Sequence, residues 1–363
     1  MAYKIAVVPG DGIGQEITQE AVRVLRAVDA KFTLGLTYET RDAGGTAYDK
    51  YGTPLPEDTL SVCKESDGVL FGAVGGTKWD SVEPSMRPEH AILGLRKGLG
   101  LYANLRPVKV ADALIEHSPL KPALVRGVDL VIVRELIGGI YFGEKCESEQ
   151  VDGTERAWDM ENYSVPEVER IARLAFETAR LRRGKVTSVD KANVLATSRL
   201  WRRTVTALAP EYADVALDHL YVDNCAMQLA VRPTQFDVIV TGNLFGDILS
   251  DLAGEVAGSL GVAPSLNVSA ERAMAQASHG SAPDIAGQDR ANPIAMVLSV
   301  AMLVDWLAGR HRDPALASAA RLIEQGVDDT VAAGISTPDL GGSATCSGFA
   351  DEVVARISGR RSG

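Results

Sequence analysis

The amino-acid sequence predicts an α/β fold made of two domains. Short apolar runs typical of strands alternate with amphipathic helical segments through the first 250 residues, which indicates a sheet with helices on both faces. The final third is helical apart from a long loop at 258–290, and 363 residues are enough for two domains. We therefore expect residues 1–101 and 258–363 to form one domain and residues 102–257 to be inserted as a second.

Period-two and period-3.6 patterns define the elements in chain order. Strands are expected at 3–8, 32–38, 68–74, 102–107, 129–134, 185–189, 214–220 and 236–240. Helices are expected at 16–28, 57–66, 89–98, 164–183, 198–209, 293–308, 314–332 and 348–358, and also after 224 and after 243. The glycine-rich turn at 10–14 joins the first strand to the first helix. Its G-x-G-x-G spacing matches neither nucleotide-binding pattern, so we interpret it as a tight turn.

Residues 140–162 predict a projecting hairpin. Asp152-Gly153 is a favoured two-residue turn between polar, partly alternating flanks. The flanks contain too little apolar surface for a core element. A mobile loop would show the same composition, but an arm that pairs with another subunit explains the alternation better.

Composition limits the function classes. The net charge of −11 disfavours nucleic acid as the main partner, because phosphate binding needs a basic surface. Four cysteines without C-x-x-C spacing indicate reduced thiols. The apolar stretch from Ile294 to Ala308 is expected to be a core helix rather than a membrane span. We expect a cytoplasmic location, or an organelle matrix if a transit peptide was removed.

Two aspartates four residues apart are the first candidate site. Asp247 and Asp251 follow a strand and a Gly-containing turn, and we place them in the first turns of a helix, on one face. Oxygen ligands on a rigid frame suit Mg²⁺ or Mn²⁺. The alternative is a pair of solvated carboxylates at a helix start.

Three arginines in apolar or special contexts form a second candidate group. Arg96 lies in an apolar helix, Arg106 precedes a proline, and Arg134 closes a buried strand. Guanidinium groups bind carboxylates in a bidentate way, so the three would suit a substrate with two carboxylates. Each alone is more often an ordinary surface or ion-pair residue.

Proton carriers and a ligand loop complete the candidates. Lys191 has apolar neighbours that can lower a lysine pKa, and Tyr141 can donate a proton or simply fill a strand face. The loop from His279 to Gly287 is rich in small residues that let a flat ligand approach the backbone. Its Asp284 could accept hydrogen bonds from a ribose diol, although an ordinary surface loop would look similar.

Six segments together carry a resemblance to a known family. Residues 10–14, 95–107, 133–143, 189–195, 242–251 and 279–287 resemble, in the same order, the signatures of the isocitrate/isopropylmalate family of β-decarboxylating dehydrogenases. The resemblance covers nearly the whole chain. It implies a two-domain, non-Rossmann α/β subunit that works as a homodimer. The implied reaction is NAD-dependent oxidative decarboxylation of 3-isopropylmalate to 4-methyl-2-oxopentanoate, a step of leucine biosynthesis, with Mg²⁺ or Mn²⁺.

The resemblance also implies a role for each matching residue. Tyr141 and Lys191, the latter from the other subunit, would transfer protons. The substrate's carboxylates would be bound by Arg96, Arg106 and Arg134, and its hydrocarbon group would face Glu89, Ile92, Leu93 and Val194. The metal would be held by Asp247, Asp251 and the other subunit's Asp223, which would also lie beside the substrate. NAD would be bound by Ile13, Asn193, His279, Gly280, Ser281, Ala282, Asp284, Ile285 and Asn292.

Some positions depart from the family pattern. Gln276-Ala277-Ser278 stand where the family usually has Glu-Pro-x, and Ala91-Ile92-Leu93 replace Gly-Leu-Leu in the substrate helix. One methylene in an apolar pocket discriminates by only about 1–3 kcal/mol, so another 3-substituted malate, such as 3-benzylmalate or a methylthioalkylmalate, is an open alternative. A catalytically silent, NAD-binding relative is a second alternative, although its catalytic positions would be expected to have changed.

Overall fold

The computed structural model describes residues 2–359 and divides into two compact units. The first unit comprises the chain up to Leu101, residues 111–119 and the chain from Ala257 onward; the second comprises residues 102–110 and 120–256. Both are α/β units, as predicted.

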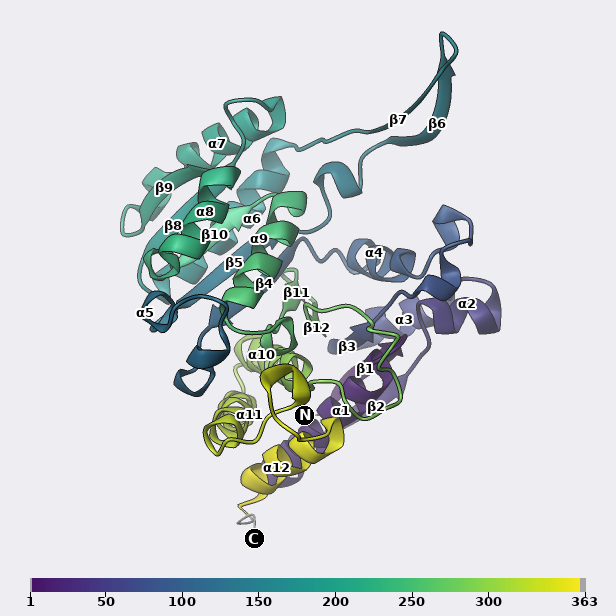
Figure 1. Ribbon diagram of the computed structural model, residues 1–363, viewed down its shortest axis with the longest axis vertical. Coiled ribbons are helices and arrows are strands. Elements are labelled where there is room, and N and C mark those ends of the chain that lie inside the picture. Colours follow the sequence, from purple (N-terminus) through teal and green to yellow (C-terminus); the bar gives the residue numbers. More distant parts are fainter. Residues whose placement is uncertain (1, 360–363) are drawn as a thin grey trace. The chain divides into compact units, whose positions relative to one another are not determined.

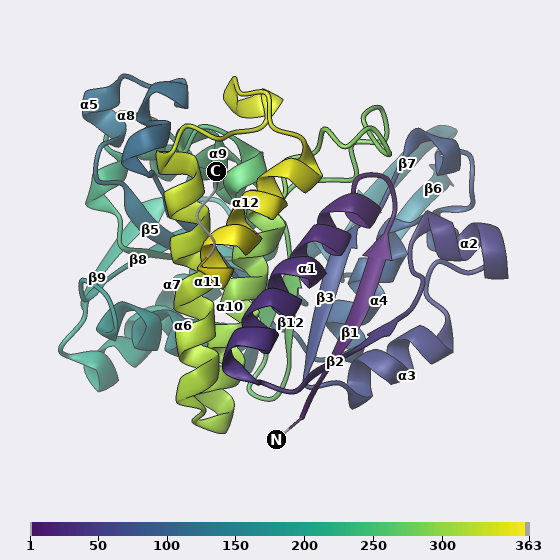
Figure 2. The same cartoon turned by 90° about the horizontal axis from the view of Figure 1, so that it is seen from below.

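The first unit has five strands in the order β2-β1-β3-β12-β11. Its strands are β1 (Tyr3–Gly10), β2 (Leu36–Thr40), β3 (Gly68–Ala73), β11 (Leu266–Val268) and β12 (Ala273–Gln276), and its helices are α1 (Gly14–Phe32), α2 (Gly45–Tyr51), α3 (Glu57–Glu65), α4 (Glu89–Gly98), α10 (Ile294–His311), α11 (Pro314–Ala332) and α12 (Cys346–Ser358), with short 3₁₀ turns including η3 (Asp112–His117), η7 (Leu260–Val262) and η8 (Pro338–Leu340). All neighbouring strands are parallel except the β11–β12 pair. Helices α1 and α10 pack on β3, and α11 and α12 pack on these two helices (Figure 2).

Helix α10 is long and apolar enough to cross a membrane, the one such helix among residues 2–359. Most of its side chains are buried against α11, α1 and β12. It is the core helix that the sequence predicted.

The second unit has five strands in the order β4-β5-β10-β8-β9. Its strands are β4 (Ala103–Lys109), β5 (Asp129–Glu135), β8 (Lys185–Asp190), β9 (Ala216–Tyr221) and β10 (Val238–Thr241), and its helices are α5 (Pro122–Val125), α6 (Val165–Arg180), α7 (Ala196–Leu208), α8 (Val222–Val231) and α9 (Asn243–Val256). Only β4 runs antiparallel to its neighbour. Helices α6 and α7 pack together on one face of these strands, and α8 and α9 pack together on the other (Figure 1).

A two-stranded hairpin projects from the second unit (Figure 1). It consists of β6 (Lys145–Val151) and β7 (Thr154–Asp159), joined by Asp152-Gly153 as predicted, with both turn residues at positive φ. Trp158 and Met160 are exposed on its returning side. The hairpin follows the 3₁₀ turn η4 (Gly139–Tyr141) and leads into the capping box of Ser164 and Glu167 that starts α6.

Several element predictions were wrong in detail. The stretch 258–290, predicted as a loop, contains β11 and β12; these strands are short and partly built from alanine, so only pairing with a neighbouring strand defines them. The glycine-rich segment before Pro54 contains helix α2. The strand predicted from Phe32 begins only at Leu36, because Phe32 still belongs to α1.

Candidate active site

Helix α9 carries the two predicted metal ligands, but not where we expected them. The helix begins at Asn243 and has no acidic residue in its first turn, so Asp247 and Asp251 lie in its second and third turns. The helix dipole acts mainly within the first turn and therefore contributes little here. Two arginines, rather than the dipole, balance these carboxylates.

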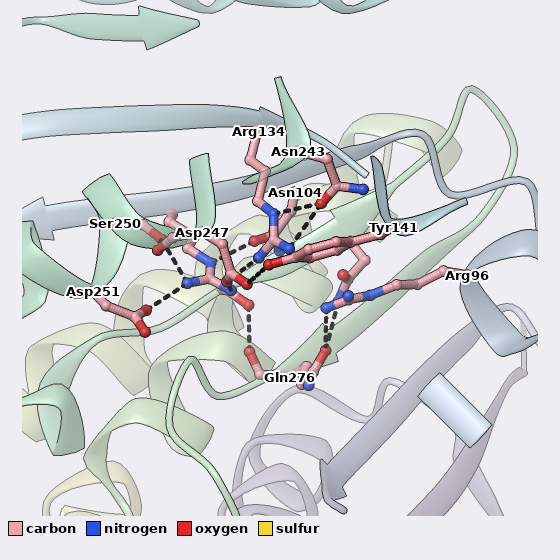
Figure 3. Close-up of polar contacts among 12 residues, drawn as sticks. Arg96, Asn104, Arg134, Tyr141, Asn243, Asp247, Ser250, Asp251 and Gln276 are labelled. Atoms are coloured by element: carbon pink, nitrogen blue, oxygen red, sulfur yellow. Dashed lines mark hydrogen bonds and ion pairs between the residues drawn. The ribbon is translucent and has the colours of Figure 1, made fainter. Parts of the chain in front are cut away.

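Arg134 is the penultimate residue of β5 and is almost completely buried, with 2% of its surface exposed. Its Nε and Nη2 atoms donate to Oδ1 of Asn243 at 3.0 and 2.8 Å, and Nη1 pairs with Asp247 (Figure 3). A Cβ atom at Gly246 would lie 2.6 Å from Cγ of Arg134. The glycine of this motif is therefore required where the arginine stem crosses the helix.

Arg106 lies on β4, which pairs with β5 so that Arg106 faces Ile132 in the register. It donates to Oδ1 of Asn104 and Oγ of Ser250, both at 2.6 Å, and pairs with Asp251 at 2.9 Å. Burial, with neighbouring Arg134 adding to it, lowers the pKa of the Arg106 guanidinium to about 10. The group is still a cation at neutral pH.

Tyr141 joins this group from the 3₁₀ turn rather than from a strand face. Its hydroxyl donates to Oδ2 of Asp247 at 2.9 Å, and the guanidinium of Arg134 lies 5.7 Å from its ring centre. The structure thus brings three predicted site residues of the second unit to Asp247, namely Arg134, Tyr141 and, at 3.5 Å, Arg106.

Lys191 and Asp223 form a separate pair in the same unit. The lysine Nζ donates to Oδ1 of Asp223 at 2.8 Å, and this hydrogen bond lowers the pKa of Asp223. Asp190, buried beside Lys191, accepts two hydrogen bonds from Arg202, at 2.8 and 2.9 Å. These bonds hold the loop whose next residues, Asn193 and Val194, are exposed.

No three His, Cys, Asp or Glu side chains come together in a metal-binding arrangement within residues 2–359 of one chain. Asp247 and Asp251 supply carboxylate oxygens with 33% and 52% of their side chains exposed, respectively. Burial raises the pKa of Asp251, and the nearby Asp247 raises it further against the opposing effect of Arg106. Two partly exposed carboxylates that repel each other fit a hard divalent cation between them. A third protein ligand would have to come from outside this pair.

Arg96 belongs to the first unit. It is buried on α4, and its Nη2 donates to Oε1 of Gln276 at 3.2 Å. On the same helix Ile92 is buried, Leu93 is partly exposed and Glu89 is exposed.

The glycine-rich turn and the His279 loop contact each other in the first unit. Ile13 N donates to the carbonyl of Ser281 at 2.8 Å, and a Cβ atom at Gly12, where φ is +53°, would lie 2.0 Å from that oxygen. Buried Asp11 accepts from the backbone of Gly45 at 2.8 Å. The turn thus contacts the His279 loop through its backbone and fixes one side of that loop.

The loop offers groups for a bound ligand. Nε2 of His279 is buried without a hydrogen-bond partner in the described structure, while its Nδ1 lies 2.9 Å from the carbonyl of Gly280. Burial lowers the pKa of His279, so its ring is neutral at pH 7. Asp284 is exposed, and buried Asn292 donates to Asp339 at 3.0 Å. Ala282 has a positive φ of +35°, and Ile285 is partly exposed. An unpartnered ring nitrogen and an exposed carboxylate on the same loop fit a nucleotide cofactor.

Sequence reasoning missed the residues that aim the arginines. Asn243, Asn104 and Ser250 each accept from a guanidinium. Asn243 stands four residues before Asp247, on the same helix face, and this spacing could have indicated it.

The fold and site define a class before they define a family. Two α/β units, one holding two buried arginines against paired carboxylates and a tyrosine, are suited to a small molecule that bears carboxylates. The sequence profile described as isocitrate/isopropylmalate dehydrogenase matches residues 4–353, and the chain belongs to this family.

Relatives and solved structures agree with this assignment. The chain is 54% identical to a 3-isopropylmalate dehydrogenase of Clostridium acetobutylicum over 93% of each chain, and 52% identical to one of Geobacillus kaustophilus over 98% of this chain and 94% of the other. Isocitrate dehydrogenase from Methylococcus capsulatus superposes with a TM-score of 0.86 at 36% identity, covering 98% of this chain and 99% of that one. A β-decarboxylating dehydrogenase from Thermococcus kodakarensis gives a TM-score of 0.79 at 39% identity, covering 98% and 96%.

Proposed function

We propose that the protein catalyses the oxidative decarboxylation of 3-isopropylmalate to 4-methyl-2-oxopentanoate, with NAD as hydride acceptor, in leucine biosynthesis. The observation that carries the proposal is the cluster around Asp247, in which Arg106, Arg134 and Tyr141 converge on the carboxylates of α9. Relatives of 49–54% identity named 3-isopropylmalate dehydrogenase support the choice of substrate.

The residues divide the work by their chemistry. Arg106 and Arg134, with Arg96, would bind the substrate's carboxylates. Lys191 of the partner subunit would take the hydroxyl proton as hydride leaves C2, and Tyr141 would protonate C3 once CO₂ has left. Mg²⁺ or Mn²⁺, held by Asp247, Asp251 and the partner subunit's Asp223, would supply Lewis-acid stabilisation of the developing negative charge.

We further propose that the cofactor is bound by the first unit and that the active protein is a homodimer. The unpartnered Nε2 of His279 and the exposed carboxylate of Asp284 support the cofactor assignment. Exposed apolar side chains on α8 and α9, namely Met227, Val231 and Ile248, support an interface between copies. We propose a cytoplasmic location for the enzyme.

The hydrocarbon pocket is the least constrained part of the proposal. On α4, Leu93 is partly exposed beside the buried Ile92, and these apolar side chains suit an alkyl group better than a third carboxylate. Benzyl and methylthioalkyl groups are also apolar and stay as alternatives.

A substrate panel tests the proposal. kcat/KM would be measured with NAD and Mg²⁺ for isopropyl-, benzyl- and methylthioalkylmalate and for isocitrate. We expect the isopropyl compound to be preferred at least about tenfold, the scale of one to two methylenes. If another compound were preferred, that compound would become the proposed substrate. If none of them gave NADH, the protein would instead be a catalytically silent relative. Lys191→Ala serves as the control: it should remain dimeric and lose activity.

A further inference from the structure

Tyr163 is a side chain that the proposed chemistry does not use. It lies where the returning side of the hairpin reaches α6, one residue before the Ser164 cap. Its hydroxyl accepts a hydrogen bond of 2.8 Å from the backbone N–H of Asn243, the first residue of α9. That N–H is among those that a helix leaves without an internal partner, so Tyr163 satisfies the start of the helix that carries Asp247.

The same ring lies against the turn that carries Tyr141. Cβ atoms added at Gly138 and Gly139 would lie 3.0 Å from Cε1 and 2.3 Å from the hydroxyl oxygen of Tyr163. The preceding residue, Asn162, accepts a backbone hydrogen bond of 3.1 Å from Gly139. Segment 162–163 thus contacts the turn through both backbone and side chain.

A third glycine completes the contact. A Cβ atom at Gly242, directly before α9, would lie 3.0 Å from the Tyr163 hydroxyl. Gly139 and Gly242 therefore leave the space into which one phenol fits, between the turn of Tyr141 and the helix of Asp247. No ordinary side chain at either position would leave the ring where it is.

Neighbouring groups fix the phenol in this place. Trp201 of α7 packs edge-on against it, with ring centres 5.5 Å apart. On the other side of the turn, buried Glu135 accepts from the backbone of Gly138 at 2.8 Å. Burial raises the pKa of Tyr163, so the hydroxyl stays protonated throughout the working range.

We propose that Tyr163 is a positioning residue that sets the distance between Tyr141 and Asp247. The 2.9 Å hydrogen bond between these two side chains joins the 3₁₀ turn η4 to α9, and the Tyr163 hydroxyl is wedged between the backbones of the same two elements. The inference rests on the proposed function for its catalytic consequence, because Tyr141 matters there as a proton donor. The contacts of Tyr163 with η4 and α9 do not depend on that function, because they lie within one chain.

Tyr163→Phe tests these contacts with and without catalysis. In the ligand-free protein, amide hydrogen exchange should become faster in both 137–142 and 241–247, and segments of the first unit should keep their rates. In steady state kcat should fall at least about tenfold, while KM for the malate changes less than about twofold, because a misplaced proton donor affects the chemical step and not uniform binding. If amide exchange in Tyr163→Phe became faster but the wild-type protein had no dehydrogenase activity, the positioning role of Tyr163 would stand and the proposed function would be rejected.

Tyr212→Phe is the matched control. Tyr212 is a buried tyrosine of the same unit, stacked on Phe176 with ring centres 4.7 Å apart and with the guanidinium of Arg180 over its ring, and both of these partners lie on α6. It should alter stability without changing kcat or the exchange of 137–142. Unchanged exchange in Tyr163→Phe, or an equal rise in both tyrosine variants, would overturn the proposal.

A double variant distinguishes the wedge from general destabilisation. Gly242→Ala should lower kcat by forcing the phenol away, and adding Tyr163→Phe should remove the clash with the hydroxyl, so the double variant should lose less than the product of the single losses. Contacting residues show such non-additivity, whereas independent ones do not. Strictly multiplicative losses would refute the wedge even if each variant folds poorly.

Discussion

The substitution Asp251→Asn tests whether Asp251 acts as a metal ligand or as a structural ion-pair partner of Arg106. Asp251 is half exposed and pairs with Arg106 at 2.9 Å. The arginine would keep its bonds to Asn104 and Ser250, both 2.6 Å, and its ion pair with Asp247 at 3.5 Å. Asp251 is half exposed to solvent, and Asp247 stays as a counter-charge for the buried Arg106, so losing this pair should cost the fold little.

The sign of the pKa shift agrees with this expectation. Burial raises the pKa of Asp251, so its contribution to stability is present at low pH and is lost as pH rises through its folded-state pKa. Above that pKa the desolvation of the ionised carboxylate is unfavourable for folding. A neutral amide also removes like-charge repulsion with Asp247, worth about 0.2–0.5 kcal/mol at this spacing. We therefore expect the free energy of unfolding to be unchanged or slightly higher.

Metal binding should respond in the opposite direction. A unit charge interacts with another at 4 Å by about 4 kcal/mol at an effective dielectric constant of 20, and each 1.4 kcal/mol is about tenfold in affinity. Loss of one carboxylate should thus weaken Mg²⁺ binding at least about 100-fold in titration calorimetry, with a matching loss of kcat/KM. Urea unfolding at pH 7 measures the free energy of unfolding, which should be unchanged or slightly higher.

Asp218→Asn is the control, since the Asp218 side chain is exposed to a similar extent and forms an ion pair with Lys185 at 2.8 Å. It should leave Mg²⁺ affinity and activity unchanged. If Asp251→Asn instead lowered the unfolding free energy by more than about 2 kcal/mol and kept its Mg²⁺ affinity, Asp251 would be a structural partner of Arg106, beyond the usual range for such pairs.

Two further predictions concern the first unit. Asp284→Ala should reduce the preference for NAD over NADP at least about tenfold in kcat/KM, because an exposed carboxylate repels a 2′-phosphate; unchanged selectivity would remove Asp284 from the ribose. His279→Gln should reduce the loss of stability on acidification from pH 7 to 5. Burial lowers the pKa of His279, so its contribution is present above about pH 6.5 and is lost as pH falls through the folded-state value, with a slope of at most about 1.4 kcal/mol per pH unit. The shift of His219 has the same direction and leaves a residual slope, and identical pH profiles for variant and wild type would contradict the assignment.

Hydrophobic periodicity was sufficient to predict the bounds of some long helices, because the signals that define them lie within their own sequences. Helix α4 and helix α11 have the predicted bounds because apolar spacing and flanking residues define them without help from the rest of the fold. Strands β11 and β12 have no such signal. They are three and four residues long, and only pairing with β3 and with each other makes them strands.

The candidate site was predictable in composition but not in its internal contacts. The spacing of Asp247 and Asp251 indicated two carboxylates on one helix face, and the apolar context of Arg134 indicated a buried cation. That Arg134 pairs with Asp247 could not be read from the sequence, because the residues are 113 positions apart and meet only through the register of β5 beside β10. Asn243 depends on the same register.

Within one chain, the two proposed proton-transfer residues belong to separate groups of side chains. Tyr141 is bonded to Asp247, whereas Lys191 is bonded to Asp223, and within residues 2–359 Asp223 does not join Asp247 and Asp251 in a metal-binding group. A lysine paired with an exposed carboxylate has no chemical task where it stands. If the active protein is the proposed homodimer, an isologous contact that brought this pair to the carboxylates of the other copy would occur twice and complete two sites. On this reasoning a protein held as a monomer would retain both pairs and lack activity, and activity that is independent of protein concentration down to dissociated chains would exclude a shared site.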